Sequence, residues 1–526
     1  MRQNWTKVER QKLKDMKKSL LLSLLALSYM TLTAMPPAPG ENALEPSRPH
    51  VRALDRHNNT SFAPARRGGE YSSDERGLCI LVNYTDQDFK DENTPLAFDS
   101  LANADPYTYN GAKASVREYF REQSGGLYVP HFDIVGPVDM PRNAYWYGHD
   151  TLGQGNDRYV VDFVLDACYG AQELGVDFSQ YDADDNGFID FVYIIYAGKG
   201  QADNVSQEHL IWPHEWDIES ALYYGMTAQD SFYVNPQNLW DERLPELNGK
   251  TLYSYACSNE LQPDEKRTGI ATMCHEFSHV LGLPDYYITQ QSSPMEDAHE
   301  EPGTWSLMSK GSYNNNGRTP PNFSVYDKYY LGWITPTFLA EPQAVTLPAD
   351  GQTYFAISRN HQVSEKGALE PDTVWYIENR QLSGWDEYIP GHGLILWRVV
   401  YDSTMWADNI PNDYTTRYGV IAASGQTSYC GRSYEGGTRQ DIPFPGSLNV
   451  TSFTVLGQKI TSIEEASDGL VSFIYDLYTP SETCKIPWEE AAEGPAYNIL
   501  GQRVREDYQG LIIRPNWKGY KLASRP

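Results

Sequence analysis

Residues 266–283 read KRTGIATMCHEFSHVLGL, and this stretch decides how the chain is interpreted. Its apolar residues recur at helical spacing, so we expect a buried or amphipathic helix that ends at Gly282 and Pro284. Within it, His275 and His279 are four positions apart. Residues at this spacing share one face of a helix, so both imidazoles can bind one metal ion. The stretch therefore predicts a metal-binding helix.

The neighbouring residues indicate a catalytic site rather than a structural one. A sharp turn at Gly282 can bring Asp285 back as a third ligand, which leaves the fourth position open, as in catalytic zinc sites. Zinc lowers the pKa of bound water from about 15.7 towards about 7 and polarises a carbonyl oxygen. Glu276 projects beside the ion, where it can take a proton from that water and deliver it to a leaving amine. The predicted reaction is hydrolysis of peptide bonds without a covalent intermediate.

Two motifs together resemble a known family. HEFSHVLGLPDYY and, downstream, GTWSLMSKGSY are similar to sequences of the immune inhibitor A-like (thuringilysin) secreted zinc metallopeptidases, a metzincin-type group. The resemblance covers residues 75–475, and it includes YDADDNGFIDFVYIIYAGKG upstream and YIENRQLSGWDEYIPGHGLILW downstream. It implies zinc ligands at His275, His279 and Asp285, a general base at Glu276, a Met-turn methionine at Met308 and an oxyanion-stabilising hydroxyl at Tyr313.

Two alternatives stay open at this point. In a gluzincin-like peptidase the third ligand is a downstream glutamate such as Glu296, Glu300 or Glu301, but Gly282 and Asp285 argue against it. In the other alternative the chain is a surface-binding protein whose β-rich half recognises glycans or proteins, beside a degenerate protease domain. The intact histidines and glutamate of the motif argue against decay.

Composition limits the classes of partner. The chain has 526 residues, a formal charge of -28 and a pI near 4.7, so its electrostatic field has the wrong sign for nucleic acid. Protein or peptide substrates are the expected partners. The six cysteines are too scattered for a disulfide scaffold or a CxxC metal site. Cys79 lies in an apolar run, which favours a core role over a zinc-blocking thiol.

The N-terminal residues predict export. Seven basic residues precede an apolar run from Leu20 to Leu32, and the run is followed by Ala34. This pattern is typical of a secretory signal peptide, which we assign to residues 1–34. Residues 35–70 are interpreted as a linker or a short pro-segment. The mature protein is then secreted or held at the cell surface, with no transmembrane span.

The rest of the chain is predicted to be an α+β protein in two main parts. Residues 71–335 mix strand patterns with helical patterns at 113–123 and 157–174, and the resemblance implies a metzincin-like catalytic domain there. Residues 336–478 carry short apolar strands separated by Gly, Pro and Asn, which favours a β-sandwich. Residues 479–526 are a linker and a strand-like tail, either a sorting or anchoring module or an accessory strand pair.

An acidic loop predicts a second metal. The spacing of the residues between 182 and 190 matches a calcium loop, although the position of its bidentate glutamate is taken by Tyr193. The expected calcium ligands are Asp182, Asp184, Asn186, Phe188 through its carbonyl, and Asp190. His214 and Glu215 in IWPHEW are also of ligand type, but the flanking tryptophans favour a packed strand.

Overall fold

The computed structural model describes residues 76–150, 157–183, 185–203, 209–223, 225–228, 244–289, 302–358, 373–413, 415–424 and 440–477. It also gives the backbone of short strands at 33–34 and beyond residue 495. The predicted signal peptide and pro-segment lie outside the described residues, apart from the strand at 33–34. No helix among the described residues has the length and apolar character needed to span a bilayer.

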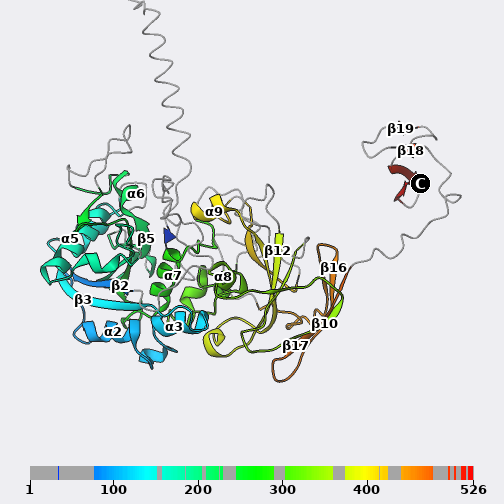
Figure 1. Cartoon of the computed structure of the whole chain (residues 1–526), viewed down its shortest axis with the longest axis horizontal. Helices are drawn as coiled ribbons and strands as arrows, with labels where there is room; N and C mark the ends of the chain where they lie inside the picture. The colour runs from blue at the N-terminus through cyan, green and yellow to red at the C-terminus, as the bar shows by residue number, and fades with distance from the viewer. Residues whose placement is uncertain are drawn as a thin grey trace, which may run out of the picture.

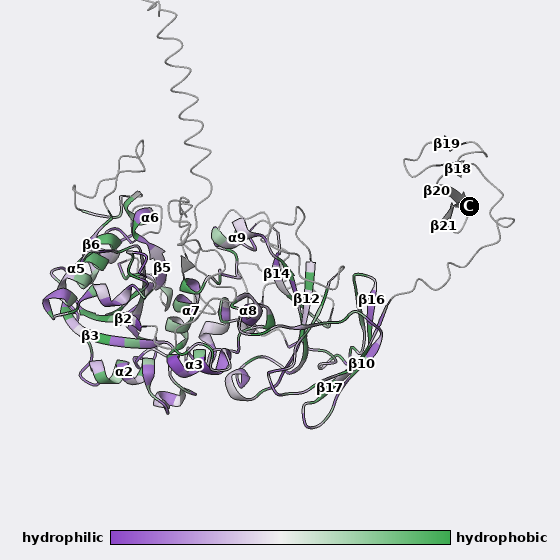
Figure 2. Ribbon diagram, viewed as in Figure 1, coloured by the Kyte–Doolittle hydropathy of each residue, from purple (hydrophilic) through white to green (hydrophobic). Residues whose placement is uncertain are grey.

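A six-stranded sheet organises the first half of the chain, with the strand order β1-β5-β8-β4-β2-β3. The strands are β1 (Thr33–Ala34), β2 (Arg76–Asn83), β3 (His131–Asp139), β4 (Val192–Lys199), β5 (His214–Asp217) and β8 (Ser254–Leu261). Neighbours from β8 to β3 are parallel, whereas β5 is antiparallel to β8, and β1 is antiparallel to β5. Figure 2 shows hydrophilic and hydrophobic positions interspersed along β3, the outer strand, whereas β2 is an almost continuous apolar run.

Helices cover both faces of this sheet (Figure 1). The α-helices of the described residues are α2 (Pro95–Asn103), α3 (Val116–Gln123), α4 (Ala144–Gly148), α5 (Val160–Glu173), α6 (Ile218–Tyr223), α7 (Ala271–Val280), α8 (Val325–Tyr330) and α9 (Ser403–Ala407). Shorter elements are the 3₁₀ turns η1 (Tyr109–Gly111), η2 (Phe178–Tyr181), η3 (Gln201–Asp203), η5 (Gly303–Trp305), η6 (Lys310–Tyr313) and η7 (Gly384–Asp386), with the hairpin β6 (Glu246–Leu247) and β7 (Lys250–Thr251). The predicted helices at 113–123 and 157–174 correspond to α3 and α5.

Successive residues of β2 enter two separate cores. Cys79 and Leu81 pack in the core that contains α3 and α7, whereas Leu78 and Ile80 pack in the core that contains α5. The alternation follows from the strand period of two residues. Cys79 is fully buried, as expected for a core residue, and burial raises the pKa of its thiol. None of the four cysteines in the described ranges forms a disulfide.

Two further sheets form the second half. The five-stranded sheet has the order β14-β13-β12-β11-β9, and the four-stranded sheet has the order β10-β17-β16-β15. Their strands are β9 (Thr337–Phe338), β10 (Gln343–Leu347), β11 (Phe355–Ile357), β12 (Thr373–Arg380), β13 (Gly393–Val400), β14 (Tyr418–Ile421), β15 (Phe453–Val455), β16 (Gln458–Glu465) and β17 (Val471–Leu477). Residues of both sheets share one apolar core, which includes Leu396 from β13 and Phe473 from β17. The chain is therefore a mixed protein of helices and sheets, in agreement with the predicted α+β class.

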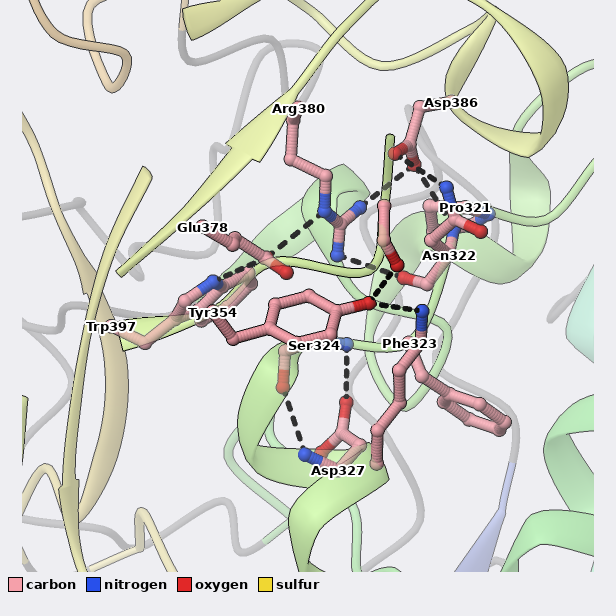
Figure 3. A network of polar contacts seen from close by, with 12 residues as sticks. Pro321, Asn322, Phe323, Ser324, Asp327, Tyr354, Glu378, Arg380, Asp386 and Trp397 are labelled. Carbon is pink, nitrogen blue, oxygen red and sulfur yellow. Dashed lines mark hydrogen bonds and ion pairs between the residues drawn. The ribbon is translucent and has the colours of Figure 1, made fainter. Parts of the chain in front are cut away.

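The two halves are packed together through a common core and a buried polar network. The core around α7 extends to α8 and to Trp397 on β13. Figure 3 shows Arg380 between two carboxylates, with Nε 2.9 Å from Glu378 and Nη1 2.7 Å from Asp386. Its Nη2 donates to the carbonyl oxygen of Asn322 in the first half, at 2.9 Å. Glu378, Arg380 and Asp386 are buried and each has a partner, so this network joins the two halves in one arrangement.

The C-terminal residues form a small sheet in the order β19-β18-β20-β21. Its strands are β18 (Ala496–Tyr497), β19 (Arg503–Val504), β20 (Leu511–Asn516) and β21 (Gly519–Ser524). The strand-like character predicted for the tail is present. Its interpretation as a sorting module or an accessory strand pair stays a prediction.

Candidate metal centre

Helix α7 presents two histidines on one buried face. Residues 273–279 are all buried, and the Nε2 atoms of His275 and His279 lie 3.2 Å apart with their rings nearly perpendicular. In Figure 1 this helix lies between the six-stranded sheet and α8. The apolar neighbours in the sequence, Met273 and Phe277, belong to the core beneath it. Packing of that apolar face therefore orients the histidine pair.

Gly282 returns the chain towards the two histidines. Its φ of +94° is in the left-handed region, which favours glycine over any residue with a Cβ. Its N–H donates to the carbonyl of His279, and the N–H of Leu283 donates to that of Ser278, so the helix ends in a Schellman turn. After this turn, Oδ1 of Asp285 lies 3.2 Å from Nε2 of His275 and 3.4 Å from Nε2 of His279.

The three converging atoms fit a tetrahedral metal. Zinc bonds of about 2.0–2.1 Å at tetrahedral angles separate neighbouring ligand atoms by about 3.3 Å. The three separations found here are 3.2, 3.2 and 3.4 Å. Three protein atoms thus form one face of a tetrahedron of the size that zinc requires.

Backbone carbonyls determine which imidazole nitrogens face the centre. Nδ1 of His275 lies 2.8 Å from the carbonyl oxygen of Leu307, and Nδ1 of His279 lies 2.7 Å from that of Leu283. A carbonyl oxygen only accepts, so both Nδ1 atoms carry a proton, and in the neutral form of each ring the lone pair of Nε2 points inward. Two lone pairs and a carboxylate oxygen at this separation repel one another unless a cation or a proton lies between them. The donor set therefore fits a divalent metal.

The charge balance of the site is strongly perturbed. Burial lowers the pKa of His275. Burial opposes ionisation of Asp285, but the facing imidazoles of His279 and His275 outweigh it and lower the pKa of Asp285. Burial, with the charges of Asp285 and Glu215, raises the pKa of Glu276 well above its ordinary value. A bound divalent cation reverses this last effect, because it favours ionised carboxylates nearby.

Glu276 lies beside the histidines in a distinct environment. Ligand-type atoms of His275, Glu276 and His279 all fall within 4.8 Å of one another. Neither carboxylate oxygen of Glu276 makes a hydrogen bond of good geometry within the described residues, although its side chain is fully buried. Asp285 is closer to both Nε2 atoms and is held by hydrogen bonds, so it is the better third ligand.

The family assignment follows from comparison with known proteins. A family model described as "Immune inhibitor A peptidase M6, catalytic domain" matches residues 73–334, which include the whole cluster.

Residues 73–334 belong to the immune inhibitor A peptidase M6 family.

Individual relatives agree with this assignment. Immune inhibitor A of Bacillus thuringiensis subsp. alesti is 29% identical over 239 residues, which are 41% of this chain and 31% of that protein. The pre-pro-metalloprotease PrtV of Vibrio cholerae is 26% identical over 357 residues, 59% of this chain and 36% of PrtV. A putative secreted metallopeptidase of Arthroderma benhamiae is 23% identical over 251 residues, 42% and 34% of the two chains. The alignments thus span about a third of the length of these curated relatives.

The segment that contains Leu307 and Met308 contacts the candidate metal centre through its backbone and its core packing. The carbonyl of Leu307 orients His275, and the next carbonyl, that of Met308, accepts a hydrogen bond from the N–H of Tyr286 at 2.8 Å. The side chain of Met308 is fully buried in the same core as α7. The role of Met308 as a Met-turn residue stays a prediction. Leu307 was not predicted from the sequence, because a contact through a backbone carbonyl does not depend on residue type.

Helix α7 also contacts β5 and η6, the turn that contains Tyr313. Tyr313 is half-buried in η6 and packs against Ala202 and Trp212; its proposed role at the oxyanion stays a prediction. His214 is a packed strand residue, as the sequence favours: Nε2 lies 2.8 Å from the hydroxyl of Tyr255, and Nδ1 faces the carbonyl of Trp212. The charge of the neighbouring Glu215 contributes to the raised pKa of Glu276.

The predicted calcium loop has a different cation beside it. Nζ of Lys250 lies 2.5 Å from Oδ2 of Asp182, whose carboxylate also accepts the N–H groups of Asn186 and Gly187. Oδ2 of Asp190 accepts the N–H of Ala183 at 2.7 Å. Asp184 lies outside the described residues. Calcium binding to this loop stays a prediction, and it requires Lys250 to release Asp182.

Calcium should therefore act in competition with Lys250. We expect added calcium chloride to raise the melting temperature of the wild-type protein, because it neutralises the carboxylates of Asp182 and Asp190. Lys250→Met should increase that shift, since it removes the competing ammonium. Differential scanning calorimetry with and without calcium measures both effects. A melting temperature that is insensitive to calcium in both proteins would remove the ion from this loop.

Proposed function

We propose that this chain is a secreted zinc endopeptidase that hydrolyses peptide bonds of extracellular proteins. In this proposal His275, His279 and Asp285 bind zinc, and Glu276 is the general base. The observation that carries it is the convergence of two Nε2 lone pairs and one carboxylate oxygen at tetrahedral separation, beside a buried glutamate.

The chemistry divides between the metal and the side chains. When bound, zinc would polarise the scissile carbonyl and lower the pKa of the attacking water. Glu276 accepts a proton from that water as its oxygen adds to the carbonyl carbon, and then delivers the proton to the amine nitrogen as the C–N bond breaks. The Tyr313 hydroxyl is proposed to stabilise the developing oxyanion. The carbonyls of Leu307 and Leu283 hold the Nδ1 protons of His275 and His279, so Nε2 is the atom of each ring that would bind the metal.

The edge of the six-stranded sheet supports an extended peptide as substrate. β5 is a four-residue strand that contains Glu215, whose charge acts on Glu276. Its outer edge pairs antiparallel with β1 of the same chain, through Thr33 and Ala34 (Figure 1). This edge therefore accepts an extended chain beside the centre, and backbone hydrogen bonds of this type bind peptides with little dependence on sequence.

The remaining features agree with this proposal. We interpret the first half as metzincin-like and the two packed sheets of the second half as a β-sandwich. A signal peptide over 1–34, export to the outside of the cell and structural calcium belong to the same proposal. The alternative of a surface-binding protein with a degenerate protease domain is opposed by the complete cluster on α7.

Metal removal is the direct test. We expect the purified mature chain to contain about one zinc ion and to digest casein or gelatin. A zinc chelator such as 1,10-phenanthroline should abolish digestion, and added zinc should restore it, because the metal activates the water. Metal analysis and gelatin zymography measure the two properties. A zinc-free protein under zinc-replete conditions, or digestion that is insensitive to the chelator, would contradict the proposal.

A further inference from the structure

Asp285 is held by a residue from the second half of the chain. Its backbone N–H donates to Oδ1 of Asn409 at 2.6 Å, and Nδ2 of Asn409 donates to Oδ2 of Asp285 at 2.7 Å. Asn409 is 2% exposed, and it lies 124 positions further along the chain. The paired hydrogen bonds occupy one carboxylate oxygen and the backbone of Asp285. They leave Oδ1 of Asp285 as the oxygen that faces the two histidines.

Local sequence explains why Asn409 can reach this position. Asp402 caps the start of α9 by accepting the N–H groups of Thr404 and Met405. At the other end, the N–H of Asn409 donates to the carbonyl of Trp406, and that of Ile410 donates to Met405. This is a Schellman turn, and the φ of Asn409 is +55°, a conformation that asparagine tolerates better than most residues. The end of α9 thus points one rigid amide at Asp285.

The contact is one of several along the same two segments. Nδ2 of Asn412 donates to the carbonyl of Tyr286 at 2.9 Å. The carboxylate of Asp413 accepts the N–H and the hydroxyl of Thr289, at 2.8 and 2.9 Å. The ring of Tyr286 stacks on that of Tyr418 with centroids 3.5 Å apart. Residues 409–413 therefore hold residues 285–289 in place, and Asn409 is the one whose amide is paired with the predicted metal ligand Asp285.

We infer that Asn409 is a positioning residue of the metal centre: it orients the carboxylate of Asp285, so the centre is complete only when both halves of the chain are folded together. The inference rests on the proposed function. Partners of metal ligands of this kind contribute about 10–100-fold to metal affinity or activity. Asn409 lies beyond residues 73–334, so the family match does not include it.

Two substitutions in the full mature chain test this role. Asn409→Gly removes the amide but keeps the backbone conformation, because glycine is the preferred residue at this position of a Schellman turn. Asn409→Asp keeps the shape but turns a carboxylate towards Asp285. We expect both variants to bind zinc about 10–100-fold more weakly than the wild type, as measured by competition with a chromophoric chelator. At saturating zinc, kcat should fall more than KM, and the visible spectrum of the cobalt-substituted protein should change.

Asn379→Asp is the matched control. Asn379 is also a buried amide of the second half, and it donates to the carbonyls of Leu347 and Gly469 away from the metal centre. This variant should lose stability but keep the zinc affinity of the wild type. Wild-type zinc affinity and an unchanged cobalt spectrum in both Asn409 variants would overturn the inference and leave the proposed function intact. A wild-type chain that bound no zinc would overturn both.

Discussion

Glu276→Gln should retain about one zinc ion per chain while kcat/KM for a peptide substrate falls by about 10²–10⁴-fold. Glutamine preserves the shape of the buried side chain but cannot accept the proton of the attacking water. The loss should be found mainly in kcat, because the metal and the substrate edge of β5 are unchanged. Metal analysis and steady-state cleavage of a fluorogenic peptide measure the two properties on the same preparation.

Glu118→Gln is the control for a buried glutamate. Glu118 is buried on α3, where it pairs with the exposed Arg121 rather than with the histidines of α7, so its substitution should leave cleavage near the wild-type rate. Near-wild-type cleavage by Glu276→Gln would show that another group takes the proton. Loss of zinc from that variant would instead make Glu276 a ligand, and the division of roles between Glu276 and Asp285 would be wrong.

Asp285→Ala and the shape-preserving Asp285→Asn should weaken zinc binding by more than about 100-fold, because loss of a direct ligand exceeds the cost of losing an outer partner. The two histidines alone would be left to hold the ion. Competition with a chromophoric chelator gives the affinity, and circular dichroism shows that the fold is retained. Peptide cleavage should fall in parallel, and excess zinc should restore part of it.

The same experiment separates the two candidate ligand sets. Glu296, Glu300 and Glu301, the third ligands expected of a gluzincin-like site, lie outside the described residues. Replacing all three by glutamine should leave zinc affinity unchanged. If that variant lost zinc while Asp285→Ala kept it, the third ligand would be one of these glutamates. Asp285 would then not be a zinc ligand, despite its position beside the two histidines.

Short-range physics explains which elements were predictable. The spacing of His275 and His279, and the left-handed turn at Gly282, depend on residues within one or two helical turns. Among the short strands predicted within residues 336–478 are β12 and β13, and they were predictable for a similar reason, since β-branched and aromatic residues suit a half-buried pleated surface. These predictions needed no knowledge of the partner across the sheet.

Long-range partners explain the rest. The acidic loop predicts a cation, but the pattern cannot show that Lys250, 68 positions away from Asp182, lies beside it. Nor can it show that Glu215 lies close enough to raise the pKa of Glu276. The domain boundary predicted between residues 335 and 336 stays a prediction. One apolar core contains residues from both sides of it, and local sequence patterns cannot show such a shared core.

The sequence alone was enough to predict helix α7, the turn at Gly282 and the three side chains proposed to bind a metal. Helix period and glycine conformation depend on only a few neighbouring residues. Only the tertiary structure decided which imidazole nitrogens face each other in the candidate metal centre and which oxygen of Asp285 joins them. Those choices depend on the Leu307 carbonyl and on the Asn409 amide, which segments distant in sequence bring to the site. Hydrogen bonds between distant segments have no sequence period, so no local pattern can record them.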